Sequence, residues 1–401
     1  MALIYPATRT RYSHTARHHT SERCTSRVQH VEITSDLKRL AGIWPGLEAT
    51  GDSTVFQAWD LFRGWVRHVA PACNGTWFVA LAGGPDSNVP QFILPLLRRQ
   101  VGTLSVIESA DLGVSDFNGP VLDRNFTPTQ SEMAAIWSEL RAQLPPADLI
   151  RLSKLPAALG THPNPLLLLP GVHPMNLSNF KTRLTRGGRQ WSSADLCEGV
   201  RVDLEARRRK LGKRGVLRLH TAVKAPEIER YFSAMVEQRA VRCRALGRDN
   251  ILDCPDICAF YRDLIKPEDP LSLGCIQALL LDDEIIATGY GLVHGDTFHM
   301  IFPTFKAERW RNYSPGLQHF AASMEWASQH GFSSFDFTIG DERFKADLGA
   351  ERFPLYELLV ALSPKGQAAV YDDRVRRFVR NHPSLRSLVN RVRCTLVPPV
   401  C

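Results

Sequence analysis

The residues best suited to acid–base chemistry in this 401-residue chain lie in one short stretch, FDFTIGDERFK, which covers Phe335–Lys345. Its first half alternates apolar and polar residues, as a half-buried strand does, and Gly340 ends the alternation. The carboxylates of Asp336 and Asp341 are suited to accept a proton. Lys345 follows Asp341 by four residues, so on a helical turn the two side chains share one face. We therefore predict Asp341, Lys345 and Asp336 as catalytic residues, with Lys345 stabilising an oxyanion or protonating a leaving group.

Structural, non-catalytic roles also remain open for these residues. An Asp341–Lys345 ion pair that closes the turn would be structural, and Asp336 faces either a cleft or solvent. We expect surface or packing roles for three histidines of the region, which are His294, His299 and His319. The chain carries no G-x-S-x-G elbow and no Cys–His signature, which argues against a covalent enzyme intermediate.

A second candidate site opens the helix that precedes this stretch, within the sequence RWRNYSPGLQ. Ser314 is predicted as the N-cap and Pro315 as the first helical residue, and Gly331 is predicted to end the helix. The unpaired N–H groups and the dipole of a helix start favour anions, phosphate above all. Arg311 adds positive charge, and Gly316 allows a ligand to approach the backbone. An anion site is therefore one interpretation of this helix start, and an ordinary capped strand-to-helix turn is the other.

The order of the predicted elements indicates an α/β chain with a mixed sheet and two units, because 401 residues exceed one ordinary core. In the second unit, three consecutive strands joined by tight turns precede the helix, and the FDFTIG strand follows it. The expected divisions are a disordered basic tail over residues 1–35, a first unit over 36–185, a second unit over 186–370 and a basic C-terminal helix or tail over 371–401.

Composition and charge restrict the class of protein further. Hydrophobic residues make up 44% of the chain, and no apolar run approaches the ~20 residues that span a bilayer, so we expect a cytoplasmic protein. The nine cysteines show no pairing pattern or zinc spacing, so reduced thiols and no metal are expected. The net charge of +8 is concentrated in residues 207–214 and 374–393, without a nucleic-acid-binding signature. We expect no DNA partner, and either solvated helix faces or contact of the C-terminal helix with an anionic surface.

The order of elements in the second unit resembles the GNAT acyltransferase fold, specifically its BioF2-like or CelD-like branch, which is associated with cellulose and exopolysaccharide biosynthesis. The sequences YSPG and FDFTIGDERFK carry the resemblance, and FILPLL, SDFNGPV and RRRKLGKRG extend it over roughly residues 50–362. The resemblance implies tandem GNAT-like units, of which the first is degenerate and completes the acceptor cleft. It also implies an acyl-CoA co-substrate and an acceptor amine or hydroxyl on a sugar, polysaccharide or cell-envelope precursor.

The resemblance further implies where the donor binds. The pantetheine arm would pair with the strand around residues 300–304, and the pyrophosphate would lie at the helix start. The implied donor-binding residues are Ile301, Phe302, Thr304, Arg311, Asn312, Tyr313, Ser314 and Gly316. RNYSPG stands where typical members carry Q/R-x-x-G-x-G/A, and Phe305-Lys306 stand where relatives often have an acidic residue, so the donor's identity stays open.

Two alternatives to acyl-CoA chemistry remain. The chain also resembles the Fem peptidyltransferases, which have two GNAT-like units and an aminoacyl-tRNA donor, and Phe344 and Lys345 match an aromatic–lysine pair of that family. The long helical arm of those enzymes has no counterpart here, so tRNA is expected as a partner only under this alternative. A catalytically silent tandem module that assists polysaccharide biosynthesis is the other alternative.

Overall fold

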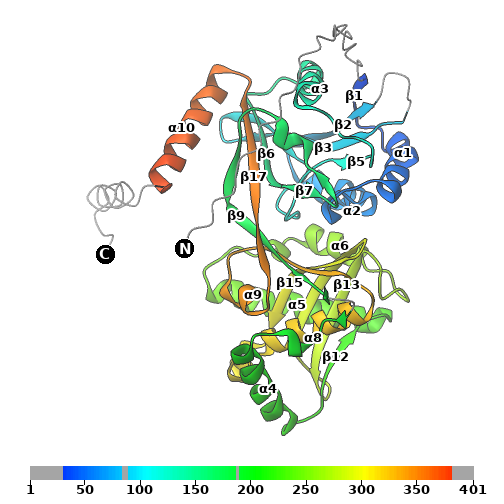
Figure 1. Ribbon diagram of the computed structural model, residues 1–401, viewed down its shortest axis with the longest axis vertical. Coiled ribbons are helices and arrows are strands. Elements are labelled where there is room, and N and C mark those ends of the chain that lie inside the picture. The colour runs from blue at the N-terminus through cyan, green and yellow to red at the C-terminus, as the bar shows by residue number, and fades with distance from the viewer. Residues whose placement is uncertain (1–29, 84–88, 187–188, 382–401) are drawn as a thin grey trace, which may run out of the picture.

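The computed structural model describes residues 30–83, 89–186 and 189–381. These residues form two lobes, each with helices packed on strands (Figure 1). Thirteen strands belong to one continuous mixed sheet, which runs in the order β1-β2-β3-β4-β6-β17-β9-β16-β15-β14-β13-β12, with the short β5 (Val121–Leu122) beside β3. The predicted α/β class with a mixed sheet is confirmed.

The first unit begins earlier than the sequence suggested. Its elements are β1 (His30–Thr34), α1 (Leu37–Thr50), α2 (Trp59–Gly64), β2 (Gly75–Gly83), β3 (Phe92–Val101), β4 (Leu104–Ser109), α3 (Gln130–Gln143) and β6 (Leu149–Pro156). β1 pairs with β2 along its whole length, so the expected tail over residues 1–35 is wrong for residues 30–34. The rest of that tail lies outside the described residues. The Asp36 carboxylate caps α1 by accepting from the N–H groups of Lys38 and Arg39.

The second unit follows the sequence prediction closely. Its elements are α4 (Glu198–Gly212), β12 (Leu217–Thr221), α5 (Ala225–Ala245), α6 (Pro255–Asp263), β13 (Gly274–Leu281), β14 (Glu284–His294), β15 (Thr297–Phe305), α8 (Pro315–Gln329), β16 (Ser334–Ile339) and α9 (Arg343–Asp347). Strands β13, β14 and β15 form the predicted antiparallel meander. Asp282 and Gly295 take the left-handed backbone conformation that tight hairpin turns need.

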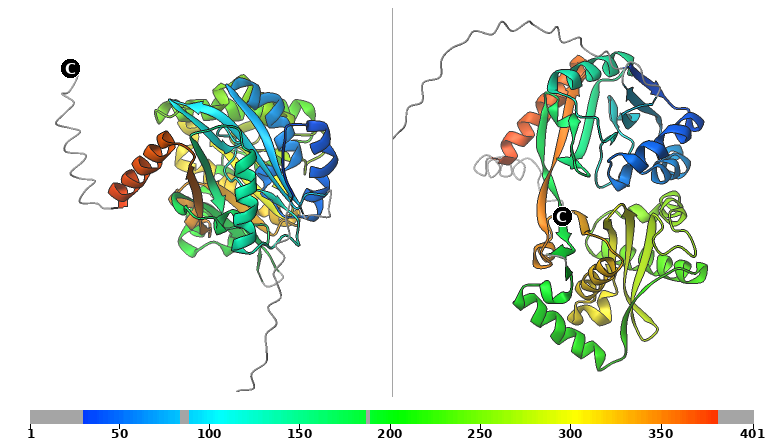
Figure 2. Two further views of the ribbon diagram at one scale, coloured as in Figure 1. Left: turned by 90° about the horizontal axis from the view of Figure 1, so that it is seen from above. Right: turned by 45° about the vertical axis from the view of Figure 1, so that its right-hand side comes forward.

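Both units repeat one order of elements: a strand, two helices, a three-strand meander, a helix and a fifth strand parallel to the fourth. The parallel pairs are β4 with β6 in the first unit and β15 with β16 in the second. The core residues place α3 on one face of the first sheet and α1 with α2 on the other. In the second unit, α8 lies on the face opposite α5 and α6 (Figure 2). The chain therefore contains an internal repeat of two units.

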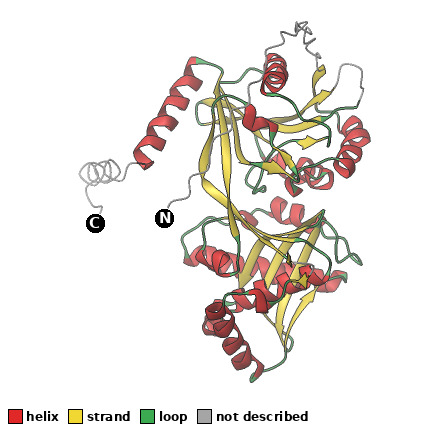
Figure 3. Cartoon of the chain, in the orientation of Figure 1, coloured by secondary structure: helices red, strands yellow, loops and turns green. Residues whose placement is uncertain are grey.

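Two long strands join the repeats. β9 (Val172–Arg183) ends the first unit but pairs with β16 of the second, whereas β17 (Glu351–Ala361) ends the second unit and pairs with β6 of the first. β9 and β17 also pair with each other and run from lobe to lobe (Figure 3). Each unit thus completes its sheet with a strand of the other.

The C-terminal helix differs from the expected boundary. α10 is described over Pro364–Asn381 and so starts before residue 371, while the basic stretch beyond residue 381 lies outside the described residues. Two of its arginines, Arg376 and Arg377, form ion pairs with Asp372 and Asp373 one turn earlier. Among the described residues, we find no helix with the length and apolar character needed to span a bilayer.

Candidate active site

Strands β15 and β16 part soon after they meet. They share three paired positions, of which the last joins His299 to Asp336. Beyond this point, β16 turns towards β9, where Ile339 pairs with Asn179. We call the point where the strands part, directly after His299 and Asp336, the fork. From the fork to Phe305, β15 therefore has a ladder partner in β14 on one edge and none in β16 on the other.

A bulge in one strand and a strained residue in the other account for the fork. Between the pairs Tyr290–Phe302 and Gly291–Met300, β15 has one extra residue, Ile301. A bulge of this kind bends and twists its strand. In β16, Thr338 has a φ of +56°, which is a costly conformation for a β-branched residue. Its N–H donates to the Asp336 carboxylate at 2.7 Å, which stabilises this turn of the backbone.

The backbone of β15 offers hydrogen-bonding groups to the open edge. The Lys306 N–H donates to the Ile286 carbonyl of β14 at 3.0 Å. The backbone N–H and C=O groups of successive residues in a strand point to opposite edges. The backbone groups of Thr304 therefore also face β14, while those of Pro303 and Phe305 face the open edge. Pro303 has no N–H to leave unpaired there, which is the usual place for proline in a sheet.

The strand residues predicted to bind the donor are placed differently from one another. Ile301 is the bulge residue at the fork, so it lies on the open edge. Thr304 is buried. Its hydroxyl forms a hydrogen bond with the Thr288 hydroxyl at 2.5 Å and donates to the Gln238 amide oxygen at 2.8 Å. The Phe302 ring packs against Tyr261 with centroids 4.8 Å apart. Phe302 and Thr304 therefore shape the strand from the α5 side.

The start of α8 lies at the end of this open edge. Ser314 occupies the N-cap position, but its φ is +50° and its hydroxyl makes no capping bond, so the expected side-chain cap is wrong. Pro315 is the first helical residue, as predicted, and Gly331 adopts φ +85° just after the helix. A Cβ on Gly316 would lie 3.1 Å from the Phe305 ring, so β15 and the first turn of α8 are in contact.

Basic residues of α4 and of the turn that follows it lie beside this helix start. The Arg207 guanidinium donates to the Asn312 carbonyl at 2.8 Å, and the Arg214 guanidinium lies 5.3 Å from the centre of the Tyr313 ring. Arg311 is exposed in the same turn. The predicted anion site is thus supplied with positive charge from a second element. The RRRKLGKR run was the signal for it, although the sequence did not place it here.

Asp336 lies at the fork, 3% exposed. Burial raises its pKa to about 6, against the lowering effects of the Thr338 N–H, of Lys181 and of the Asn179 amide, which lies 3.4 Å away. The Nδ1 atom of His299 is 3.7 Å from the carboxylate. Because burial holds the pKa of His299 well below its usual range, this imidazole is neutral.

We expect Asp336→Asn to remove a pH dependence of stability. A carboxyl group whose pKa rises from 3.8 to about 6 on folding favours the folded state below pH 3.8, and this contribution is lost as the pH rises through 6. At about 1.4 kcal/mol per pH unit, the loss amounts to about 3 kcal/mol. Urea unfolding at pH 4 and pH 7 measures this effect. Between the two pH values, the free energy of unfolding of the variant should rise relative to that of the wild type by an amount of this order. If the free energies of unfolding of the variant and the wild type differed by the same amount at both pH values, this would contradict the burial of Asp336.

The structure separates Asp341 from Lys345. Asp341 is exposed and lies 3.5 Å from Arg352. Lys345 is 3% exposed, and its ammonium donates to the carbonyls of Ile339 at 2.8 Å and Gly340 at 3.0 Å. It also lies 3.4 Å from the Thr338 carbonyl and 3.1 Å from the Glu342 carboxylate. The Asp341–Lys345 ion pair is therefore wrong, and catalytic roles for both residues stay predictions.

His319 packs on the backbone of β14. Both of its ring nitrogens are buried without a hydrogen-bond partner, and burial lowers its pKa to about 3. A Cβ on Gly289 would lie 2.2 Å from the His319 ring. This imidazole is therefore neutral and held in the core, as expected for a packing residue.

We expect Gly289→Ala to destabilise the protein by about 1–3 kcal/mol, because the added methyl group overlaps the His319 ring. The matched control is Gly42→Ala in α1, where nothing lies within 4 Å of the added methyl group. Alanine favours a helix over glycine, so the control should be neutral or stabilised by up to about 1 kcal/mol. Urea unfolding of the three proteins measures both effects. Equal stability of the two variants would contradict the packing described.

A residue that the sequence did not single out also reaches the fork. Asp116 lies in the loop 110–120 of the first unit, where burial raises its pKa and the nearby Thr338 side chain lowers it by a smaller amount. The neighbouring Phe117 ring lies 6.4 Å from the His299 ring. The only sequence signal was the polar stretch SDFNGPV, in which no residue was assigned a role.

Comparison with protein families matches residues 199–346 to the acetyltransferase (GNAT) domain. The second unit therefore has the GNAT fold. Because the first unit repeats the same order of elements, the chain has a tandem GNAT fold. Comparison with curated proteins gives no match.

Solved structures resemble the whole tandem. The crystal structure of FemX covers 82% of this chain and 97% of its own length, at 12% identity and a TM-score of 0.54. A conserved protein of unknown function from Bacteroides thetaiotaomicron VPI-5482 covers 82% and 99%, at 8% identity and a TM-score of 0.52. At these identities the likeness concerns the fold alone. The GNAT domain of this chain therefore comes with a second unit in an arrangement that FemX shares.

Proposed function

We propose that the chain is an acyltransferase that moves an acyl group from acyl-CoA to an amine or hydroxyl of a sugar, a polysaccharide or a cell-envelope precursor, as in the BioF2-like and CelD-like branch. One observation carries the proposal: β15 is open on one edge from the fork to Phe305, and the start of α8 lies at the end of that edge. A GNAT-type acyl or aminoacyl transferase is also what the family match supports.

The two parts of the site suit the two parts of such a donor. The pantetheine arm of CoA is an extended chain with two amides, which can add to an open strand edge as a peptide does. Its pyrophosphate can accept from the first N–H groups of α8, at Gly316 and Leu317. The nearby Arg207, Arg214 and Arg311 offset the negative charge of the phosphates. The thioester would then lie at the fork, beside Asp336.

Donor binding is tested by thermal unfolding of the full chain with acetyl-CoA and with longer acyl-CoAs. At 100 times the dissociation constant, a ligand of the folded state stabilises it by about 2.7 kcal/mol. We expect an increase in Tm that grows with acyl-CoA concentration and is smaller for pantetheine alone, which lacks the phosphates. A Tm that no acyl-CoA changes would contradict the proposal.

A Fem-like, aminoacyl-tRNA-dependent peptidyltransferase is the second candidate, favoured by the net charge of +8 and by the fold shared with FemX. The same titration with bulk tRNA separates the two candidates. A tRNA-dependent increase in Tm that falls steeply with salt, with no response to acyl-CoA, would favour the second. Donor binding without turnover would favour an accessory role in polysaccharide biosynthesis.

A further inference from the structure

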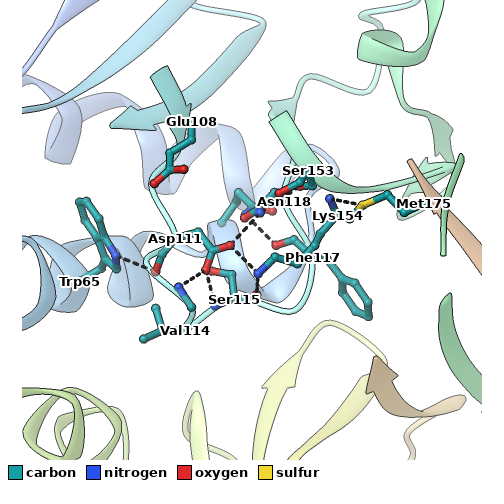
Figure 4. Close-up of polar contacts among 12 residues, drawn as sticks. Trp65, Glu108, Asp111, Val114, Ser115, Phe117, Asn118, Ser153, Lys154 and Met175 are labelled. Atoms are coloured by element: carbon teal, nitrogen blue, oxygen red, sulfur yellow. Dashed lines mark hydrogen bonds and ion pairs between the residues drawn. The ribbon is translucent and has the colours of Figure 1, made fainter. Parts of the chain in front are cut away.

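The loop 110–120, which follows β4 in the first unit, reaches across to the fork in the second. The Asp111 carboxylate accepts from the N–H groups of Gly113 at 2.8 Å and Ser115 at 3.1 Å, and its other oxygen accepts from the Asn118 amide at 3.1 Å. The Trp65 indole donates to the Asp111 carbonyl at 3.1 Å. Figure 4 shows these bonds around Asp111, which fix the loop from inside.

An ion pair closes the loop against β6. The Lys154 ammonium lies 2.5 Å from the Asp111 carboxylate and donates to the Ser115 carbonyl, also at 2.5 Å (Figure 4). Both side chains are at least four-fifths buried. Asn118 in turn bonds to the backbone of β6, through its N–H to the Lys154 carbonyl at 2.9 Å and its amide to the Ser153 carbonyl at 3.1 Å. We call the Asp111–Lys154 pair with these bonds the clamp.

The clamp occupies the position in the first unit that the open edge has in the second. β4 and β6 are parallel over three paired positions, as β15 and β16 are, and the loop begins directly after them. In the first unit the loop bonds to the β6 backbone beyond this point, so that edge is already used. The first unit therefore presents its loop to the second unit's fork and keeps no equivalent open edge for a donor.

The outer part of the loop is fixed against the second unit at three points. The Tyr261 hydroxyl of α6 donates to the Val114 carbonyl at 3.0 Å, and the Phe117 ring contacts the His299 ring at the fork. Between them lies the half-buried Asp116, near enough to the Thr338 side chain for that side chain to lower its pKa. Asp116 thus belongs to the first unit in sequence and to the fork in space.

We propose that Asp116 is the general base of the transfer, supplied by the first unit to the fork of the second. This role rests on the proposed function. The acceptor's nitrogen or oxygen attacks the thioester carbonyl of acyl-CoA, and its proton passes to the Asp116 carboxylate. When the tetrahedral intermediate collapses, the C–S bond breaks and the CoA thiolate leaves, taking up a proton from Asp116 or from water. The new amide or ester bond and free CoA are the products.

Asp116 is better placed for this step than Asp336. Asp336 is 3% exposed, and its two oxygens already accept from the Thr338 N–H and the Asn179 amide. Asp116 is partly exposed, so its carboxylate is more accessible to the acceptor's proton than that of Asp336. Burial raises the pKa of Asp116, which brings a carboxylate closer to the range in which a base is effective.

Several charged or titratable groups surround Asp116 and set its protonation. They are Asp111 on the same loop, Lys154 on β6, Arg239 on α5, Tyr261 on α6, Asp336 on β16 and Lys345 on α9. Asp336 is the informative one, because the charge of Asp116 raises the pKa of Asp336. Neutralising Asp116 should therefore lower the pKa of Asp336.

The test uses the full chain with acetyl-CoA as donor and water as acceptor, and measures released CoA by mass spectrometry under single-turnover conditions. Asp116→Asn should bind acetyl-CoA within about twofold of the wild type by calorimetry but release CoA at least 100-fold more slowly, since general base catalysis contributes ~10²–10⁴-fold. The matched control is Asp283→Asn in the β13–β14 turn, where the side chain is 94% exposed. It should behave as the wild type does.

The pH profile distinguishes a base from a structural carboxylate. The wild-type rate should rise with pH through the pKa of Asp116, and the Asp116→Asn rate should lack this rise. A rate for Asp116→Asn equal to that of the Asp283→Asn control would overturn the role of Asp116 and leave the transferase standing. If wild-type protein gave no binding heat with acetyl-CoA, the proposed function would fall, and the role of Asp116 with it.

Discussion

Gly316→Glu is expected to weaken acyl-CoA binding at least tenfold relative to Gly316→Gln. Both side chains are of similar size and displace the Phe305 ring equally, since a Cβ at this position already lies 3.1 Å from it. Only glutamate places a negative charge at the N–H groups of α8 where the pyrophosphate would lie. Calorimetric titration with acetyl-CoA measures the difference. Equal affinities would mean that the start of α8 does not hold the phosphates.

The two variants also exclude a trivial explanation. A carboxylate in the first turn of a helix interacts favourably with the helix dipole, by about 0.3–1 kcal/mol. Gly316→Glu should therefore be at least as stable as Gly316→Gln in the absence of ligand. Reduced binding by the more stable protein cannot result from unfolding of α8.

Lys345→Met is expected to lower the free energy of unfolding by about 2–4 kcal/mol. The methionine fills much of the same volume but cannot donate to the carbonyls of Ile339 and Gly340 or pair with Glu342. Buried acceptors without donors cost about 1–3 kcal/mol, and the pair with the half-exposed Glu342 adds little to this. Urea unfolding measures the loss.

Asp341→Asn is the comparison for this prediction. Asp341 is exposed and 3.5 Å from Arg352, so its loss should change stability by at most about 1 kcal/mol. A Lys345→Met protein that unfolds like the wild type, yet binds acetyl-CoA without turnover, would instead show that the ammonium acts on the reacting atoms. The pair of variants thus separates the structural role of Lys345 from the catalytic one that the sequence predicted.

The second unit was predictable because its signals are local. The meander strands alternate or run apolar between residues that favour tight turns, and Pro315 and Gly331 mark the start and end of α8. β9 escaped prediction because its sequence, VHPMNLSNFKTR, is polar and carries a proline. Its strand conformation depends on β16 and β17 on either side, which lie more than 150 residues away in sequence. β4 escaped prediction as well, because it is short and lies between two turns.

The site was predictable to the same extent. Asp336 and the start of α8 were found because strand and helix ends are visible in the sequence. The sequence predicted the wrong partner for Lys345. Its ammonium contacts Glu342, three residues earlier, and the carbonyls at the end of β16, rather than Asp341. Asp116 could not be found, since its contact with Thr338 depends on how two units fold against each other.

The exchange of β9 and β17 has a consequence for how the chain can be divided. The matched GNAT region, residues 199–346, contains neither strand. Cut out on its own, it would leave β16 as a bare edge with Phe335 and Phe337 beside it, a surface that recruits other strands and aggregates. Neither half completes its sheet alone, so we expect the tandem to fold as one cooperative body, in which damage to either sheet is transmitted to the other.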